Sequence, residues 1–281
     1  MNKLTIVYAM TLTVMFPICA NSQGLSKTIT SVPHTRTSSN EEVIKQLSRQ
    51  YAWLHDRAWI SEQWTGEEKP FRIIRATIDA TLTSGIKPEA LISKYKIASE
   101  RSPSDPKALF RWGYTAYQAA TQPGKTNSEG LGQLTQVRQD FPFAHSPHTY
   151  EYDRLRFLVQ SFGFGSSDMA RVGARLLKLH PNDDDVEYSY VKCLTDDPTR
   201  ACRLQALANT RLLVRKNPNV PSVYALLATV YSALWASNND KQYAAKAVEA
   251  YQEYLRKAPA DFAYRKQAES NIAFIKAKMA Q

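Results

Sequence analysis

Two cysteines, Cys193 and Cys202, could form a covalent bond with each other, because they flank a short polar segment, residues 195–198, that is typical of a tight turn between antiparallel helices. We expect one thiol near the end of the first helix and the other in the first turn of the next, so the two could meet across the hairpin. An oxidising compartment would permit a disulfide, and closing so short a loop would stabilise the fold by about 2.5 to 3 kcal/mol on the chain-entropy account. The sequence therefore predicts a Cys193–Cys202 disulfide. A catalytic redox pair is disfavoured, since the spacing is not that of a Cys-x2-Cys at a helix start.

Two further groups of residues have the chemistry of metal ligands. His145 and His148 form the only close pair of histidines, and the nearest carboxylates, Glu151 and Asp153, could at most complete a surface site. Residues 183–185 are three consecutive aspartates, but they lack the alternating ligands and the turn glycine of a calcium loop. Negative residues are favourable at a helix N-terminus without any metal. We therefore expect both groups to be helix-start residues, and we predict no metal and no cofactor.

The sequence lacks the common motifs of catalysis. Residues 163–167 are rich in glycine and serine, but no lysine follows to make a phosphate-binding loop. Neither a Gly-x-Ser-x-Gly elbow nor a His-Glu-x2-His zinc motif is present. The sequence therefore predicts no catalytic residue and a protein that is not an enzyme. A helical enzyme with an unrecognised site is the least favoured alternative.

The first 22 residues have the features of an export signal. Lys3 precedes an apolar run without charge, residues 4–18, and small residues follow it. This pattern is typical of a secretory signal peptide, residues 1–22, cleaved after Ser22 or Ala20. The run is shorter than the roughly 20 residues of a spanning helix, so we expect no transmembrane span in the mature chain. The sequence predicts an exported protein, periplasmic or secreted.

The chain has 281 residues and a formal net charge of +10, of which the signal peptide holds one positive charge. The lysines and arginines are spread along the chain, which favours a role in solubility and permits a weak attraction to acidic envelope surfaces. No nucleic-acid-binding motif is present, and we predict no nucleic-acid partner. Residues 23–38 are rich in serine and threonine without apolar periodicity, which predicts a flexible leader.

Residues 39–89 predict an N-terminal helical cap. A first helix, from residue 39 to about 64, carries the aromatic residues Tyr51, Trp53, Trp59 and Trp64. A second helix from about residue 70 has isoleucine and leucine on one stripe and a stop at Gly85. We interpret this segment as a cap laid over the helices that follow.

In the segment from residue 218 to 259, large and small residues have the spacing expected of two closely packed helices. Its first half reads large-x2-Leu-small-x2-Tyr, and its second half reads Ala-x3-Tyr-x7-Pro. This pattern resembles the tetratricopeptide repeat, a helix pair of about 34 residues. The residues that carry the resemblance are Tyr224, Leu227, Ala228, Tyr231, Ala247, Tyr251 and Pro259.

A related period runs through the chain from about residue 90. Prolines that end an amphipathic run stand at 103, 142, 181, 218 and 259, at intervals of 39, 39, 37 and 41 residues. Each interval would hold one repeat and a few loop residues, and in the last interval we expect polar residues 237–242 to form that loop. Asp105, Ser146 and Asp197 each precede a proline, which predicts helix N-caps at these positions.

The resemblance implies an all-α fold, a right-handed α-solenoid of antiparallel helix pairs with capping helices at both ends. The repeats would cover residues 90–281 and be degenerate after residues 142 and 181, with a terminal capping helix over about 261–280. Gly113 and Ala228 would occupy the small position at which a partner helix approaches closest.

The resemblance also implies a function, because the first helix of each repeat lines a concave groove that binds a peptide or partner protein. Its groove positions fall here on two sets of residues. The first is Lys107, Phe110, Tyr114 and Tyr117, and the second is Ser222, Ala225, Thr229 and Ser232. We therefore predict a non-catalytic protein–protein interaction scaffold of the bacterial cell envelope. The alternative is a structural or assembly component of an envelope complex that uses its outer surface.

Overall fold

The computed structural model describes residues 64–122, 127–140, 147–162 and 167–281, and these residues form eleven helices. The predicted signal peptide, leader and first cap helix lie outside the described residues, apart from Trp64. In chain order the helices are α4 (Lys69–Thr83), α5 (Pro88–Arg101), α6 (Pro106–Ala120), α7 (Asn127–Asp140), α8 (Tyr150–Ser161), α9 (Ser167–Leu179), α10 (Asp184–Asp196), α11 (Arg200–Lys216), α12 (Pro221–Asn238), α13 (Lys241–Lys257) and α14 (Tyr264–Met279).

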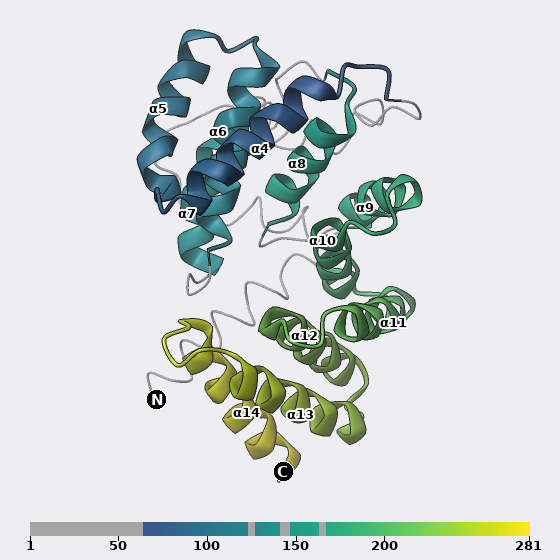
Figure 1. The fold of residues 1–281 in the computed structure, drawn as a ribbon. Coiled ribbons are helices and arrows are strands. Elements are labelled where there is room, and N and C mark those ends of the chain that lie inside the picture. Colours follow the sequence, from purple (N-terminus) through teal and green to yellow (C-terminus); the bar gives the residue numbers. More distant parts are fainter. Residues whose placement is uncertain (1–63, 123–126, 141–146, 163–166) are drawn as a thin grey trace, which may run out of the picture.

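The helices pack mainly against their neighbours in sequence. Consecutive helices from α5 to α14 contact one another, and α4, α6, α8, α10 and α12 also form a contiguous series, each touching the next. Figure 1 shows the chain progressing from α4–α8 at one end of the molecule to α12–α14 at the other. The described part of the chain is thus all-α, as predicted, with neighbour packing consistent with a helical repeat array.

The second helix of the predicted cap is α4, which begins beside Pro70 and ends just before Gly85. Gly85 has φ +92°, a left-handed conformation that glycine adopts without strain, so the predicted stop is confirmed. Ile74 and Ile78 are buried, but Ile73 is 55 % exposed. The apolar stripe predicted for this helix therefore faces the core only in part.

The helix caps agree with the sequence at some positions and differ at others. The Asp105 carboxylate accepts a bond from the N–H of Lys107 at 2.9 Å, so the N-cap predicted for α6 is confirmed. The N-cap of α11 is Thr199, two residues after the predicted Asp197. The N-cap of α8 is Thr149, whereas the predicted Ser146 lies outside the described residues. In both cases the proline lies in the approach to the helix and not in its first turn.

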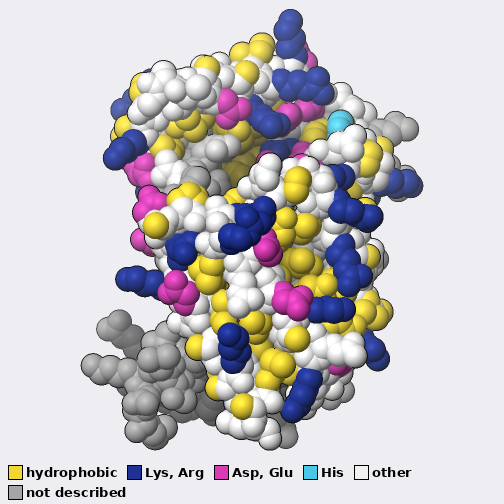
Figure 2. All heavy atoms as spheres, turned by 60° about the horizontal axis from the view of Figure 1, so that its bottom comes forward, with side chains coloured by type: hydrophobic (Ala, Val, Ile, Leu, Met, Phe, Trp, Pro, Cys, Tyr) yellow, Lys and Arg dark blue, Asp and Glu magenta, His cyan; other side chains and the backbone are white. Residues whose placement is uncertain are grey.

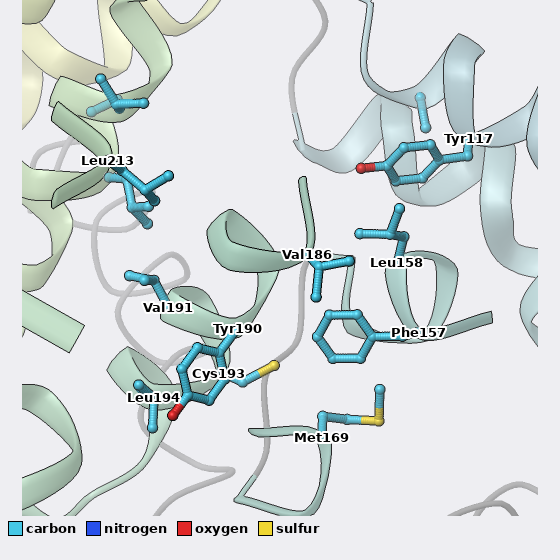
Figure 3. Packing of buried hydrophobic residues seen from close by; sticks show 14 of the residues in the cluster. Tyr117, Phe157, Leu158, Met169, Val186, Tyr190, Val191, Cys193, Leu194 and Leu213 are labelled. Atoms are coloured by element: carbon cyan, nitrogen blue, oxygen red, sulfur yellow. The ribbon is translucent and has the colours of Figure 1, made fainter. Parts of the chain in front are cut away.

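The two cysteines lie on either side of the α10–α11 turn, as predicted, but as separate thiols. Cys193 is completely buried, whereas Cys202 is partly exposed. In Figure 3 the sulfur of Cys193 points toward Phe157 and Met169, the side of α8 and α9. The predicted disulfide is therefore not present in the structure, because Cys193 is turned toward the core and not toward α11.

The α12–α13 hairpin matches the sequence pattern most closely. Ala228 is completely buried, as expected for the position of closest helix approach. The loop predicted over residues 237–242 is much shorter, because α12 extends to Asn238 and α13 begins at Lys241. Asn239 makes the turn in a left-handed conformation, φ 55°. The residues that the sequence assigned to this loop therefore lengthen the two helices, which have 18 and 17 residues.

The C-terminal helix α14 packs one face on the array, as predicted for a terminal helix. Ala268 and Ile275 are buried, while Lys266, Glu269 and Lys276 are exposed. One continuous hydrophobic cluster runs from Phe71 in α4 to this helix. None of the helices in the described part of the chain is long and apolar enough to cross a membrane.

Candidate functional site

The most unusual feature of the interior is α8, whose twelve residues are all buried. Its sequence combines aromatic and aliphatic residues with charged ones. A buried charge is stable only when it is paired or hydrogen-bonded. The charged and amide side chains, each 9 % exposed or less, are Glu151, Asp153, Arg154, Arg156 and Gln160.

Arg154 ties α8 to the start of α10. Its Nε donates to Asp183 Oδ2 at 2.5 Å, and its Nη2 donates to Asp185 Oδ2 at 2.6 Å. The Tyr150 hydroxyl donates to Asp183 Oδ2 at 2.9 Å, and the Val186 N–H donates to Asp183 Oδ1 at 3.1 Å. Burial alone would raise the pKa of Asp183, but the hydrogen bond and positive charge of Arg154 outweigh it and hold the pKa below its usual value.

A second set of polar contacts ties α8 to α4. Arg75 Nη1 donates to both carboxylate oxygens of Glu151, at 3.0 and 3.1 Å. The Glu68 carboxylate accepts from the backbone N–H groups of Tyr150 and Glu151, both at 2.9 Å, and so satisfies two donors at the start of α8. The Trp64 indole N–H donates to Asp153 Oδ2 at 2.9 Å. These bonds fix α4 and the segment before it against α8.

The carboxylates of this network are engaged by cations, an indole or backbone N–H groups, so their role is to orient helices. Glu151 and Asp153, which the sequence offered as a surface metal site, are buried and bonded in this way. Asp183 caps α10, as the sequence predicted for a helix start. Within the described ranges, no group of three or more His, Cys, Asp and Glu side chains could hold a metal ion.

The first predicted groove set on α6 lies largely in the core. Lys107 is exposed, but Phe110, Tyr114 and Tyr117 are 0, 3 and 9 % exposed. The Phe110 ring contacts Phe71 of α4 edge-on at 5.2 Å between centroids. This differs from the open groove that the family resemblance implies, because α4 packs against α6 and covers it.

The two tyrosines of this set have different surroundings. The Tyr114 hydroxyl donates to Asp79 Oδ1 at 2.7 Å, and burial together with this bond raises the pKa of Tyr114 to about 12. Burial, followed by the negative charge of Asp185, raises the pKa of Tyr117. In Figure 3 Tyr117 points from α6 into the space above Val186 of α10. Both side chains thus help to pack α6 against its neighbours.

The second predicted groove set, on α12, is more accessible, but two of its three hydroxyls donate to their own helix. Ser222 is exposed and Ala225 is 9 % exposed. Thr229 and Ser232 are half-buried, and their hydroxyls donate to the carbonyls one turn earlier, at 2.9 and 2.8 Å. This surface therefore presents small side chains, and the hydroxyl protons of Thr229 and Ser232 are used within the helix.

A pocket of about 370 Å³ opens between the first turns of α4 and α6. Lys69 from α4 and Lys107 and Arg111 from α6 surround it, together with Glu67 and an apolar patch that includes the exposed Ile73. In the described residues none of the three cations forms an ion pair. With three cations against one carboxylate, the pocket is positive and suits an anionic group beside an apolar one.

Sequence reasoning found one member of this pocket, Lys107. The one-turn spacing of Lys107 and Arg111 was visible in the sequence and indicates a common helix face. Lys69 and Ile73 belong to a separate helix, and only the packing of α4 on α6 brings them to the site.

Comparisons of the chain with protein-family models, with curated proteins and with solved structures give no match.

Proposed function

We propose that this protein is a non-catalytic scaffold of the bacterial cell envelope that binds an acidic segment of a partner protein. In this proposal the helices form a right-handed α-solenoid of tetratricopeptide type, and the protein is exported. Neighbour packing of helix pairs and the sequence pattern of the α12–α13 hairpin support the repeat assignment. The pocket between α4 and α6 is the observation that carries the binding proposal.

The pocket offers both parts of a peptide-binding site. Ile73, 55 % exposed, supplies apolar surface, and burying its exposed part is worth roughly half of the 1.5 to 3 kcal/mol gained on fully burying a side chain of this size. Lys69, Lys107 and Arg111 supply positive charge that no carboxylate in the described residues neutralises. A charge pair near a protein surface contributes up to about 4 kcal/mol before the cost of desolvation. A segment with Asp or Glu next to Leu or Phe fits this arrangement.

The test uses short synthetic peptides in which Asp or Glu flanks Leu or Phe, with binding followed by fluorescence anisotropy. We expect these peptides to bind and their lysine-substituted counterparts to bind at least about tenfold more weakly, because the rim charges would repel them. Lys107→Glu with Arg111→Glu should abolish the preference for acidic peptides. Ile73→Ser should weaken binding of both kinds of peptide while the preference remains.

The matched control changes the same net charge at a distance from the pocket. Lys246→Glu with Lys266→Glu alters exposed cations of α13 and α14, and should leave peptide binding unchanged. Equal binding of acidic and basic peptides, or an equal loss in the control pair, would reject this pocket as the partner site. Binding of peptides that is insensitive to both pairs would favour the alternative, a partner held by another surface.

A further inference from the structure

Among the described helices, α11 has the largest net positive charge. Its 17 residues contain four arginines and one lysine, and no aspartate or glutamate. Figure 2 shows basic side chains interspersed with hydrophobic ones along the right-hand edge of the molecule, the side on which α9 and α11 lie in Figure 1. A basic and partly apolar helix on a surface is unusual enough to need a physical account.

The outward positions of α11 combine a row of arginines with a row of apolar side chains. At about 100° per residue, the arginines fall within about 60° of one another, and the apolar residues fill an overlapping sector of about 80°. All six residues are exposed, including the two leucines at 40 and 42 %. This outer face of α11 consists of Arg200, Arg211 and Arg215 with Leu204, Ala208 and Leu212.

The two other cations of α11 already have partners. Arg203 is buried and donates to the carbonyl oxygens of Asp197 and Ala233. Lys216 Nζ lies 3.0 Å from Glu187 Oε2 and 3.8 Å from Asp184 Oδ1.

The arginines of the outer face are exposed and have no carboxylate partner among the described residues. Arg211 donates to the neutral hydroxyl of Tyr231 at 3.1 Å. Neither it nor Arg200 or Arg215 forms an ion pair within the part of the chain that the structure describes. The outer face thus keeps three full positive charges next to exposed leucines.

We infer that the outer face of α11 binds the surface of an anionic lipid bilayer. Three charges along one helix match the dense, unpatterned negative charge of such a surface, and need no pocket or fixed hydrogen-bond geometry. The leucines can enter the region between headgroups and acyl chains, as the apolar face of an interfacial helix does. This site lies on different helices from the α4–α6 pocket, so the protein could hold a partner and contact a membrane at the same time.

The experiment is co-sedimentation of the full chain with vesicles of phosphatidylcholine alone and with phosphatidylglycerol added. Binding to the neutral vesicles measures any contribution from the apolar run at residues 4–18, so the inference rests on the difference between the two compositions. We expect tighter binding to the anionic vesicles, weakening as salt rises. Arg200→Gln with Arg215→Gln should weaken it about 25-fold, since each basic residue near the surface contributes about fivefold.

Two further variants separate a membrane face from general positive charge. Lys246→Gln with Lys266→Gln removes the same charge from α13 and α14, and should change binding to anionic vesicles less than about threefold. Leu204→Ser with Leu212→Ser should weaken binding while its salt dependence remains. Thermal unfolding of each variant checks that the fold is retained.

Three results would overturn the inference. They are equal binding to neutral and anionic vesicles, an equal loss in the α13–α14 pair, and no effect of the arginine pair in a folded protein. The last result would leave the outer face of α11 as a surface for a protein partner or for solvent.

Discussion

Replacing Asp183 by asparagine should destabilise the protein by about 2 to 4 kcal/mol. The Asp183 side chain is 14 % exposed and that of Arg154 is 4 %, so their pairing lies largely out of water. Breaking a buried ion pair by removing one charge costs about 3 to 5 kcal/mol, because the other charge stays buried without compensation. Asp185, whose side chain is 59 % exposed, still accepts from Arg154 and reduces the loss. Asparagine can keep the N-cap bond to Val186, but its amide nitrogen replaces the oxygen that accepts from Arg154 and Tyr150, so the loss includes these hydrogen bonds as well as the charge.

The control is Asp184→Asn, one residue further along the same helix. Asp184 is exposed, and its nearest cation, Lys216 Nζ, lies 3.8 Å away. An exposed pair of this kind contributes about 0 to 1 kcal/mol. Both variants lose one negative charge at the start of α10, so their difference reports the buried contacts of Asp183 with Arg154 and Tyr150. Chemical unfolding followed by circular dichroism gives both free energies.

The effect of Asp183 should also depend on pH in a defined direction. Arg154 holds the pKa of Asp183 below its usual value in the folded protein, despite the opposing effect of burial. The pairing therefore contributes its full stability above about pH 4, the pKa of the unfolded chain, and loses it as pH falls through the lower folded-state pKa. The gap between wild type and Asp183→Asn should be constant from about pH 5 to 8 and shrink in acid. A gap that widens in acid, or two aspartate variants of equal stability, would refute the reasoning.

Three other substitutions and one labelling reaction test the packing. Gly173→Ala should cost about 1 to 3 kcal/mol, because the added Cβ would lie 2.8 Å from a phenylalanine ring carbon. Gly132→Ala meets nothing within 4 Å and should stabilise its helix by up to about 1 kcal/mol in the same unfolding assay. Ala228→Leu should lower the midpoint of thermal unfolding, since the site is completely buried between helices and overpacking costs about 1 to 3 kcal/mol. Alkylation without reductant should label Cys202 and spare Cys193 until the protein unfolds, whereas resistance of both in the unfolded protein would establish the disulfide.

The sequence predicted the helices well, because their ends depend on local chemistry. Proline, glycine and cap residues act on the backbone within a few positions, and Gly85 and Asp105 have the predicted roles. Even the errors are local, as at α11, where Thr199 and not Asp197 caps the helix. The burial expected at Ala228 followed from the same short-range pattern and is confirmed.

The contacts around α8 could not be predicted in this way, because they join residues far apart in sequence. Trp64 and Asp153 are 89 residues apart, and Arg75 and Glu151 are 76 apart. Read alone, a run of alternating charges on a helix indicates a solvent-exposed face. The opposite holds for α8, since α4 and α10 supply partners for its charges from both sides.

The position of α4 also explains why the predicted groove set and the structure differ. A repeat pattern predicts whether each α6 residue is buried or lines the groove from the geometry of one helix pair alone. It takes no account of a further helix, such as α4, that packs against the pair. α4 buries Phe110 through the ring of Phe71, yet its first turn also brings Lys69 and Ile73 beside Lys107. The charge-assisted bonds from Arg75 Nη1 to both carboxylate oxygens of Glu151 hold α4 in this place. The helix that covers the aromatic surface of α6 is therefore the same helix that completes the basic pocket, and the buried charges of α8 maintain that pocket's geometry.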